Sequence, residues 1–268
     1  MAYTTIDDPS AHFQTALYSG TGSSQAITND GNSDLQPDWI WWKRRDTGYA
    51  HGLVDSSRGT GKYLRSDSSS AEGTDYTYIT SFDSDGFTIP SGDQSSNNSS
   101  GTYVAWQWKA GGGTTASNSV GDISSTVQAN TTAGFSIVTY TGNGNANQTI
   151  GHGLGAVPKM ILFKNRSNTA YWYVYHVDTG NDTMTYLNLT NAAQSLSSQF
   201  STPTTTTFNV SNENSTFNGY NSSSQTYVAY VFAEKQGYSK FGKYKGNGST
   251  DGPFIYTGFK PAFVILKG

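Results

Sequence analysis

The chain has 268 residues, a formal net charge of -3 and no cysteine, and only 13% of its residues are charged. This length allows one large domain or two ordinary ones, and the low charge without a lysine-rich block argues against a nucleic-acid partner. Because cysteine is absent, neither disulfides nor thiolate metal sites can hold the fold, so packing must supply its stability.

Residues 1–12, MAYTTIDDPSAH, form a polar N-terminal segment. Asp7 and Asp8 stand where a secretory signal would carry positive charge followed by an apolar run. No segment of the chain approaches the roughly 20 apolar residues that a membrane-spanning helix needs. We therefore expect neither export through a signal peptide nor insertion into a membrane.

Residues 13–111 contain short runs of aromatic and β-branched residues separated by Gly, Asn, Ser and Pro clusters, which are strand and turn signals. The most apolar run is PDWIWWK, residues 37–43, which holds three of the six tryptophans in the chain. No window longer than about ten residues spaces its apolar residues as a helix would. The pattern predicts an antiparallel β-sandwich for this part of the chain.

Residues 112–133 follow with the composition of a linker. They lie within the stretch KAGGGTTASNSVGDISSTVQANTTAG, which is rich in Gly, Ser and Thr and has few large apolar residues. We expect this Gly/Ser/Thr-rich segment to connect two folded modules.

Residues 134–237 repeat the organisation of residues 13–111. PKMILFK, which starts at Pro158, matches PDWIWWK: each is a proline, five mostly apolar residues and a lysine. Further along, VDSSRGTGKYL and VDTGNDTMTYL align at an offset of 123 residues, and TYVAWQW and TYVAYVF at an offset of 124. These repeats predict a second β-sandwich module.

Residues 238–268 have the pattern of the start of a third repeat. PAFVILK, which starts at Pro261, is again proline, five apolar residues and lysine, and an aromatic residue with a Gly-rich turn precedes it. The likeness stops at Gly268, before any counterpart of the later strands. Two explanations remain open: a natural chain that continues further, or a truncated repeat.

The three copies bear on whether the tryptophans of PDWIWWK form a ligand platform or a folded core. Trp41 corresponds to Leu162 in the second copy and to Ile265 in the third. The position stays large and apolar without staying aromatic, which suits a packed core better than a stacking surface. We expect a buried strand that is covered on both faces, or that packs one face against a neighbouring module or subunit.

No catalytic or metal-binding pattern is recognisable. The four histidines are scattered, and the acidic turns NDGNSD and DSDG lack the glutamate that would complete a calcium loop. GTGK at residues 59–62 lacks the first glycine of a phosphate loop. Asp55 and Asp178 recur at equivalent positions without a second carboxylate, so we expect structural hydrogen bonds from them. We expect no enzyme activity, no catalytic residue, no metal and no cofactor.

Surface aromatic residues offer a binding chemistry instead. Aromatic side chains in polar loops can stack on the faces of sugars. A carbohydrate-binding module of the lectin type would use such residues. The candidates for contacts with a ligand or receptor are Tyr49, Tyr76, Tyr78, Trp172 and Tyr220.

Several phrases of the chain resemble a known family. They are similar to the repeated β-modules of tail-fibre-like and other virion surface structural proteins of tailed bacteriophages, particularly marine ones. The phrases are PDWIWWKRR with HGLVDSSRG, IGHGLGAVPKMILFKNR, FIYTGFKPAFVILK and TYVAYVFAE. The resemblance covers nearly the whole chain apart from the linker, and it rests on strand and turn phrases without a catalytic signature.

The resemblance implies a tail-fibre or capsid-fibre component that is exposed on the virion and takes part in host attachment. The implied partners are other virion proteins, such as a tail adaptor, a nozzle or the capsid, and a glycan or receptor on the host surface. The resemblance also implies a homo-oligomer, a trimer when such a protein is a fibre, on the virion exterior after assembly in the bacterial cytoplasm. By analogy with fibres, residues 1–12 are expected to anchor the protein. A lectin-like module and a polysaccharide depolymerase remain alternatives.

Overall fold

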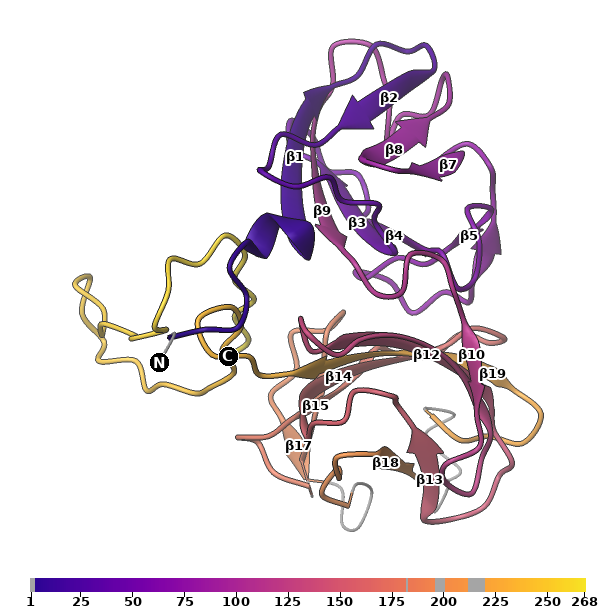
Figure 1. The fold of residues 1–268 in the computed structure, drawn as a ribbon, viewed down its shortest axis with the longest axis vertical. Coiled ribbons are helices and arrows are strands. Elements are labelled where there is room, and N and C mark those ends of the chain that lie inside the picture. Colours follow the sequence, from indigo (N-terminus) through magenta and orange to yellow (C-terminus); the bar gives the residue numbers. More distant parts are fainter. Residues whose placement is uncertain (1–2, 182, 196–200, 212–219) are drawn as a thin grey trace.

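The chain is an all-β protein built from antiparallel sheets, so the predicted fold class is confirmed. The computed structural model describes residues 3–181, 183–195, 201–211 and 220–268, and Figure 1 shows them as two stacked bodies with a looped C-terminal segment. A 3-10 turn, η1 (Pro9–Ala11), precedes the first strand, and the described residues form no α-helix. No helix in this part of the chain is long and apolar enough to cross a membrane.

Module 1, residues 13–111, is a sandwich of two sheets. Its strands are β1 (Phe13–Ser19), β2 (Gln25–Thr28), β3 (Trp39–Arg44), β4 (Gly52–Asp55), β5 (Lys62–Tyr63), β6 (Gly73–Thr74), β7 (Ser81–Asp83), β8 (Gly86–Ile89) and β9 (Thr102–Trp108). The larger sheet has the order β1-β9-β3-β4, the smaller has the order β2-β8-β7, and β5 pairs with β6. Between the two sheets lies a core of Ala16, Ile27, Ile40, Trp42, Val54, Tyr78, Ile79, Phe87, Ile89 and Ala105.

Module 2 is a second sandwich with a larger main sheet. Its strands are β10 (Ala116–Asn118), β11 (Ser125–Asn130), β12 (Phe135–Thr141), β13 (Gln148–Gly151), β14 (Pro158–Asn165), β15 (Tyr173–His176), β16 (Thr183–Tyr186), β17 (Gln194–Ser195), β18 (Thr207–Val210) and β19 (Thr226–Ala233). The main sheet has the order β10-β11-β12-β19-β14-β15-β16-β17, and β13 pairs with β18 beneath it. A core of valine, isoleucine, phenylalanine and tyrosine side chains lies between these two layers.

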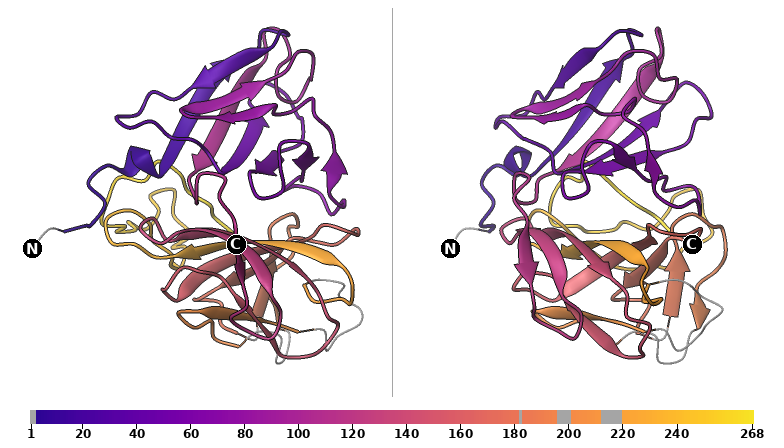
Figure 2. Two further views of the ribbon diagram at one scale, coloured as in Figure 1. Left: turned by 45° about the vertical axis from the view of Figure 1, so that its right-hand side comes forward. Right: turned by 90° about the vertical axis from the view of Figure 1, so that its right-hand side faces the viewer.

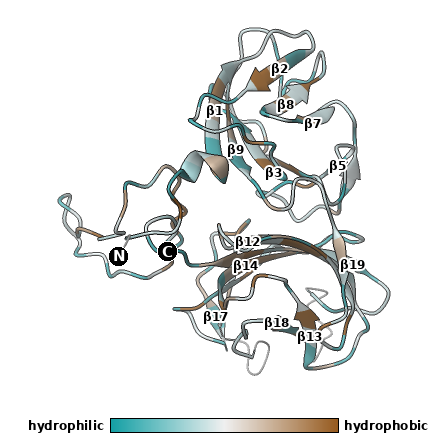
Figure 3. Cartoon of the chain, in the orientation of Figure 1, coloured by the Kyte–Doolittle hydropathy of each residue, from teal (hydrophilic) through white to brown (hydrophobic). Residues whose placement is uncertain are grey.

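The larger sheets of the two modules face each other, so the molecule has four layers of strands (Figures 1 and 2). The space between them is filled by the central cluster, which consists of Trp39, Trp41, Leu53, Leu64, Trp108, Ala110, Phe135, Ile137, Leu162, Trp172, Val174, Val228 and Tyr230. Figure 3 shows hydrophobic residues along β12 and β14 in the layer that faces module 1. Burial of this much apolar surface joins the modules into one body.

The stacking explains why the PDWIWWK run is apolar on both faces. Side chains alternate along β3, so Ile40 and Trp42 enter the core of module 1 while Trp39 and Trp41 enter the central cluster. All four side chains are buried, which confirms the predicted core role of this strand. The second face is covered by the other module of the same chain.

The main sheets of the two modules share strand order and aromatic contacts. The order β1-β9-β3-β4 in module 1 corresponds to β12-β19-β14-β15 in module 2. Tyr18 stacks on Tyr103 with ring centroids 5.0 Å apart, and Tyr140 stacks on Tyr227 at the same separation. In each pair the second ring lies on the last strand of its module, β9 or β19, and the first ring lies on the neighbouring strand, β1 or β12.

The prediction of a linker over residues 112–133 is wrong for much of that segment. It contains β10 and β11, and β11 pairs along its whole length with β12. Val127 on β11 is buried in the core of module 2. The Ser- and Thr-rich composition misled the prediction because a strand with one polar face needs few apolar residues.

The predicted third repeat over residues 238–268 forms no strand in the structure. Beyond an isolated bridge between Lys235 and Ser239, its residues follow an irregular path beside the two modules (Figure 1). The corresponding segments of the modules, β3 and β14, lie between two hydrogen-bonded neighbours. Residues 261–267 have no such neighbour, and a strand without a sheet is not stable in water.

Candidate functional site

An ion-pair network lies between the modules. Arg58 lies beside Asp55 and donates through Nη1 to Glu72 Oε2 at 2.8 Å. From module 2, Arg166 Nε donates to Glu72 Oε2 at 2.8 Å, and the Tyr230 hydroxyl donates to Asp55 Oδ2 at 2.7 Å. Asp55 thus has the structural hydrogen-bonding role expected from the sequence, and the network binds one module to the other.

The electrostatics of this network keep its groups charged. Burial raises the pKa of Glu72, but hydrogen bonds and charge from Arg166 and Arg58 outweigh burial and hold that pKa below its ordinary value. Burial lowers the pKa of Arg58, and the negative charges of Asp55 and Glu72, together with the Tyr230 oxygen, raise it further than burial lowers it. The side chains of Arg58 and Asp55 have no exposed surface. The network therefore holds the two modules together, and its charged groups are paired with one another.

Asp38 fixes the start of the connection between the modules. Its buried carboxylate accepts the backbone N–H groups of Ala110, Gly112 and Gly113 at 2.7, 2.8 and 2.7 Å. It also accepts the Ser56 hydroxyl at 2.7 Å. Because the Asp38 carboxylate accepts four hydrogen bonds from within the chain, its role is structural.

Lys164 is the other buried charged group between the modules. Its Nζ donates to the carbonyl oxygen of Ala170 at 2.8 Å and to that of Ser69, in module 1, at 3.2 Å. Burial lowers the pKa of Lys164 to about 8.

Among the described residues no group of three or more His, Cys, Asp or Glu side chains could hold a metal ion.

Three of the five aromatic candidates for ligand contact are buried, so the prediction that they are exposed is wrong. Trp172 lies in the central cluster and donates its indole N–H to the Arg65 carbonyl oxygen at 2.8 Å. Tyr220 belongs to the core of module 2, and Tyr78 to the core of module 1. Each ring fills space between packed layers.

The other two candidates are accessible on module 1. Tyr49 is 38% exposed, and the guanidinium of Arg44 lies 5.1 Å from the centroid of its ring. Tyr76 is 67% exposed and packs its ring over Gly61, where a Cβ atom would come within 2.2 Å of the ring. Both rings are held in place by module 1 and present a surface to solvent.

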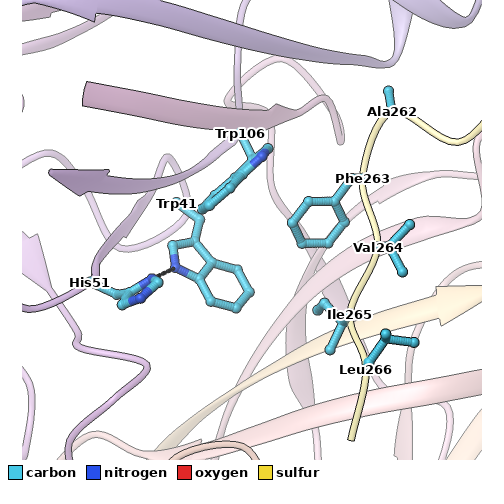
Figure 4. Close-up of a pocket in the computed structure, with 8 residues that line it drawn as sticks. All are labelled: Trp41, His51, Trp106, Ala262, Phe263, Val264, Ile265 and Leu266. Atoms are coloured by element: carbon cyan, nitrogen blue, oxygen red, sulfur yellow. Dashed lines mark hydrogen bonds between the residues drawn. The ribbon is translucent and has the colours of Figure 1, made fainter. Parts of the chain in front are cut away.

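A cleft lies elsewhere, between module 1 and the C-terminal segment (Figure 4). It has a volume of about 430 Å³ and is lined by Trp41, His51, Trp106 and residues 262–266. Trp41 on β3 and Trp106 on β9 are cross-strand partners, so the pairing of these strands places both indoles on the same face. One wall of the cleft is therefore aromatic, and the other is the apolar C-terminal segment.

Phe263 anchors the C-terminal segment on this aromatic wall. Its ring centroid lies 5.2 Å from that of Trp108, 5.4 Å from that of Trp106 and 6.0 Å from that of Phe13. Figure 4 shows Phe263 directed at the two tryptophans of the cleft. Aromatic contacts of this kind add to the area buried and fix the position of the segment.

His51 supplies the polar contact of the cleft. It accepts the indole N–H of Trp41 on Nδ1 at 3.0 Å, which leaves the proton of the neutral ring on Nε2. Burial is the main reason that the pKa of His51 lies below its ordinary value; Lys43 lowers it further and Asp67 raises it. The ring is neutral at pH 7, and no carboxylate lines the cleft. This chemistry suits apolar side chains better than acid-base catalysis.

Sequence reasoning missed this cleft, although part of its signal was readable. Trp106 stands two residues before Trp108 in TYVAWQW, so the two indoles share one face of β9. What was not readable is that residues 262–266 fold back onto that face. The fold-back depends on Phe263 meeting an aromatic surface more than a hundred residues away in sequence.

One protein family, described as a domain of unknown function (DUF7483), matches residues 8–268. The chain belongs to this family. The match spans both modules and the C-terminal segment, so the cleft lies within the DUF7483 domain. No curated protein and no solved structure matches the chain significantly.

Proposed function

We propose that this DUF7483 protein is a non-enzymatic structural protein of a bacteriophage virion exterior, a tail-fibre or capsid-fibre component that takes part in host attachment. The four-layer body carries the proposal. Its two sandwiches share the central cluster, and the buried ionic groups between them form ion pairs with one another, which hold the two modules together. Such a body holds a fixed shape and presents loops, which suits a particle-surface protein. The virion context rests on the resemblance of the strand phrases to tail-fibre-like modules.

Assembly with other virion proteins fits the surface of the molecule. With only 13% charged residues, the chain offers a hydroxyl- and amide-rich surface for close protein contacts. The C-terminal segment adds exposed apolar residues, including Phe254, Ile255 and Tyr256. Exposed apolar residues in a group mark protein interaction sites. We infer partners in a tail adaptor, a nozzle or the capsid, and further copies of the same chain.

The location on the virion is tested by antibody labelling. An antibody raised against the recombinant chain is applied to purified particles of a phage that encodes it, and the particles are imaged by electron microscopy. We expect label on the tail or the capsid surface, and none after the antibody is absorbed with the recombinant protein. Particles that stay unlabelled while the protein is abundant in the lysate would rule out the virion role.

Host attachment through a surface glycan is favoured by the two exposed tyrosines of module 1. Tyr49 and Tyr76 are the predicted contact residues that the structure leaves accessible, and Arg44 supports the ring of Tyr49. An aromatic face of this kind packs against the apolar face of a sugar. A lectin-like role within the virion would use these rings.

Binding to host cells or to a glycan array tests that role. Tyr49→Ala and Tyr76→Ala together should weaken binding about tenfold or more, because one stacked ring contributes roughly 0.5–1.5 kcal/mol. Tyr171→Ala, which alters an exposed tyrosine of module 2, is the matched control and should bind normally. Equal binding by all variants contradicts the assignment of these rings, and release of shorter saccharides from host capsule contradicts the non-enzymatic role.

A further inference from the structure

In both modules the strand with the proline-to-lysine pattern pairs with the last strand of its module. On β3, Trp41 lies opposite Trp106 of β9, and on β14, Leu162 lies opposite Tyr230 of β19. Both β9 and β19 begin with Thr-Tyr-Val-Ala and continue with alternating large side chains. The pairing partner of this kind of strand is therefore the same in both modules.

The two faces of these paired strands pack against the same kind of surface in both modules. Trp41 and Leu162 point into the central cluster, between the modules. Their neighbours Trp42 and Phe163 point into the core of their own module. Alternation along the strand thus separates a face shared between modules from a face that closes a sandwich.

Residues 261–267 show the same separation without being a strand. Phe263 is partly buried against the central cluster, as its counterpart Met160 in β14 is, and its counterpart Trp39 in β3 is buried within the cluster. Val264 and Leu266, which correspond to the sandwich-facing positions, are 62% and 69% exposed. In Figure 4 Phe263 and Ile265 point toward Trp41, and Val264 and Leu266 point away from it.

The backbone of this segment is also without a pairing partner. No backbone-to-backbone hydrogen bond joins residues 261–267 to any other residue that the structure describes. The segment is fixed through side chains: Phe263 packs on the aromatic wall, and Lys267 donates to the carbonyl oxygen of Leu189. Amide groups from Ala262 to Lys267 are available to a strand that comes alongside.

We propose that residues 261–267 are a docking site for one antiparallel β-strand with the side-chain pattern of β9 and β19, Thr-Tyr-Val-Ala followed by alternating large residues. Both strands of that kind in residues 1–268 are already paired, so the occupant comes from outside these residues. Docking by strand addition supplies main-chain hydrogen bonds, and alternate side chains supply specificity. The inference goes beyond the proposed virion role and can be tested independently of it.

The surroundings of the segment match the side chains of this occupant. In the register of the modules, Phe263 and Ile265 would face large aromatic side chains, as Met160 faces Phe232 and Leu162 faces Tyr230. Those side chains would enter the cleft beside Trp41 and Trp106 and extend the central cluster that Phe263 already joins. The docking surface is thus continuous with the interface between the modules.

A synthetic peptide tests the proposal on the full chain. The peptide carries the β19 sequence TYVAYVFA with added terminal lysines for solubility, and hydrogen exchange is followed at the amides of residues 262–267. With free peptide at ten times its dissociation constant, exchange at these amides should slow about tenfold. A peptide with the same residues in scrambled order should give no protection.

Proline substitutions supply matched variants. Ile265→Pro combined with Leu266→Pro removes one N–H from each side of the strand and should abolish protection, because successive amides point to opposite edges. Phe254→Pro combined with Ile255→Pro alters exposed apolar residues outside the docking segment and should leave peptide binding unchanged. Circular dichroism checks that both variants keep the β fold.

Three outcomes overturn the proposal. One is the absence of protection both with the free peptide and with the peptide fused behind Gly268 through a Gly-Ser linker, which raises its effective concentration. Another is equal protection by the scrambled sequence. The third is self-association of the chain that the proline pair at residues 265 and 266 abolishes, because the occupant is then a second copy.

Discussion

Replacing Trp39 by alanine is expected to lower the free energy of unfolding by about 3–5 kcal/mol, the usual cost of truncating a large buried aromatic residue. The ring is buried at the middle of the central cluster, 4.3 Å from the centroid of Tyr230 and 4.4 Å from that of Trp108. The cavity would open between the modules, where neither sandwich alone can close it. Chemical denaturation measures the loss, and a melting temperature lower by on the order of 10 °C should accompany it.

Leu17→Ala is the control for that prediction. Leu17 also lies on a strand of the main sheet of module 1, but its side chain is exposed. Its truncation should change stability by roughly 0.5 kcal/mol or less. A loss at Trp39 as small as this would mean that the two modules do not share a core.

Arg58→Met is the second change with a large expected effect, a loss of about 3–5 kcal/mol, because it leaves buried carboxylates without their partner. Asp55 has no exposed surface, and Glu72 retains only Arg166 once Arg58 is gone. Denaturant unfolding at pH 7 measures the loss. Adding Asp55→Asn to Arg58→Met should recover part of the stability, since the cost comes from the uncompensated charge.

The pH dependence gives an independent measure of the same network. The folded pKa of Glu72 lies below its ordinary value of 4.5, so its contribution to stability is complete above that pH and is lost as the pH falls through the folded pKa. Glu72→Gln should therefore flatten part of the acid-induced loss of stability. Arg45→Met removes an exposed arginine and should leave both stability and its pH dependence unchanged. An unaltered acid profile in Glu72→Gln would contradict the assigned role.

The local sequence pattern predicted burial correctly where a strand is long and its copies in the chain can be compared. Trp41 and its counterpart Leu162 were expected in a core from their shared size and apolarity, and both lie in the central cluster. The recurrence of Asp55 without a second carboxylate indicated a structural role, and its contacts are structural. These predictions held because alternation and side-chain volume are properties of the segment itself.

Exposure of single aromatic residues was not predictable in the same way. Tyr76 and Trp172 both follow polar stretches, yet Tyr76 is exposed and Trp172 is buried between the modules. The difference arises from the stacking of the two main sheets, which covers Trp172 and places the Arg65 carbonyl oxygen beside its indole N–H. Contacts more than a hundred residues apart in sequence leave no local signature.

The sequence alone determined the all-β class, the turn-separated strands and the buried strand at PDWIWWK, because strand periodicity and turn chemistry are encoded over a few residues. Only the tertiary structure decided what covers the second face of that strand, that β11 belongs to a sheet, and that Phe263 folds back onto Trp106 and Trp108. An apolar face specifies that it must be covered, and any apolar surface of suitable shape can cover it. Which surface does so depends on how the whole chain packs.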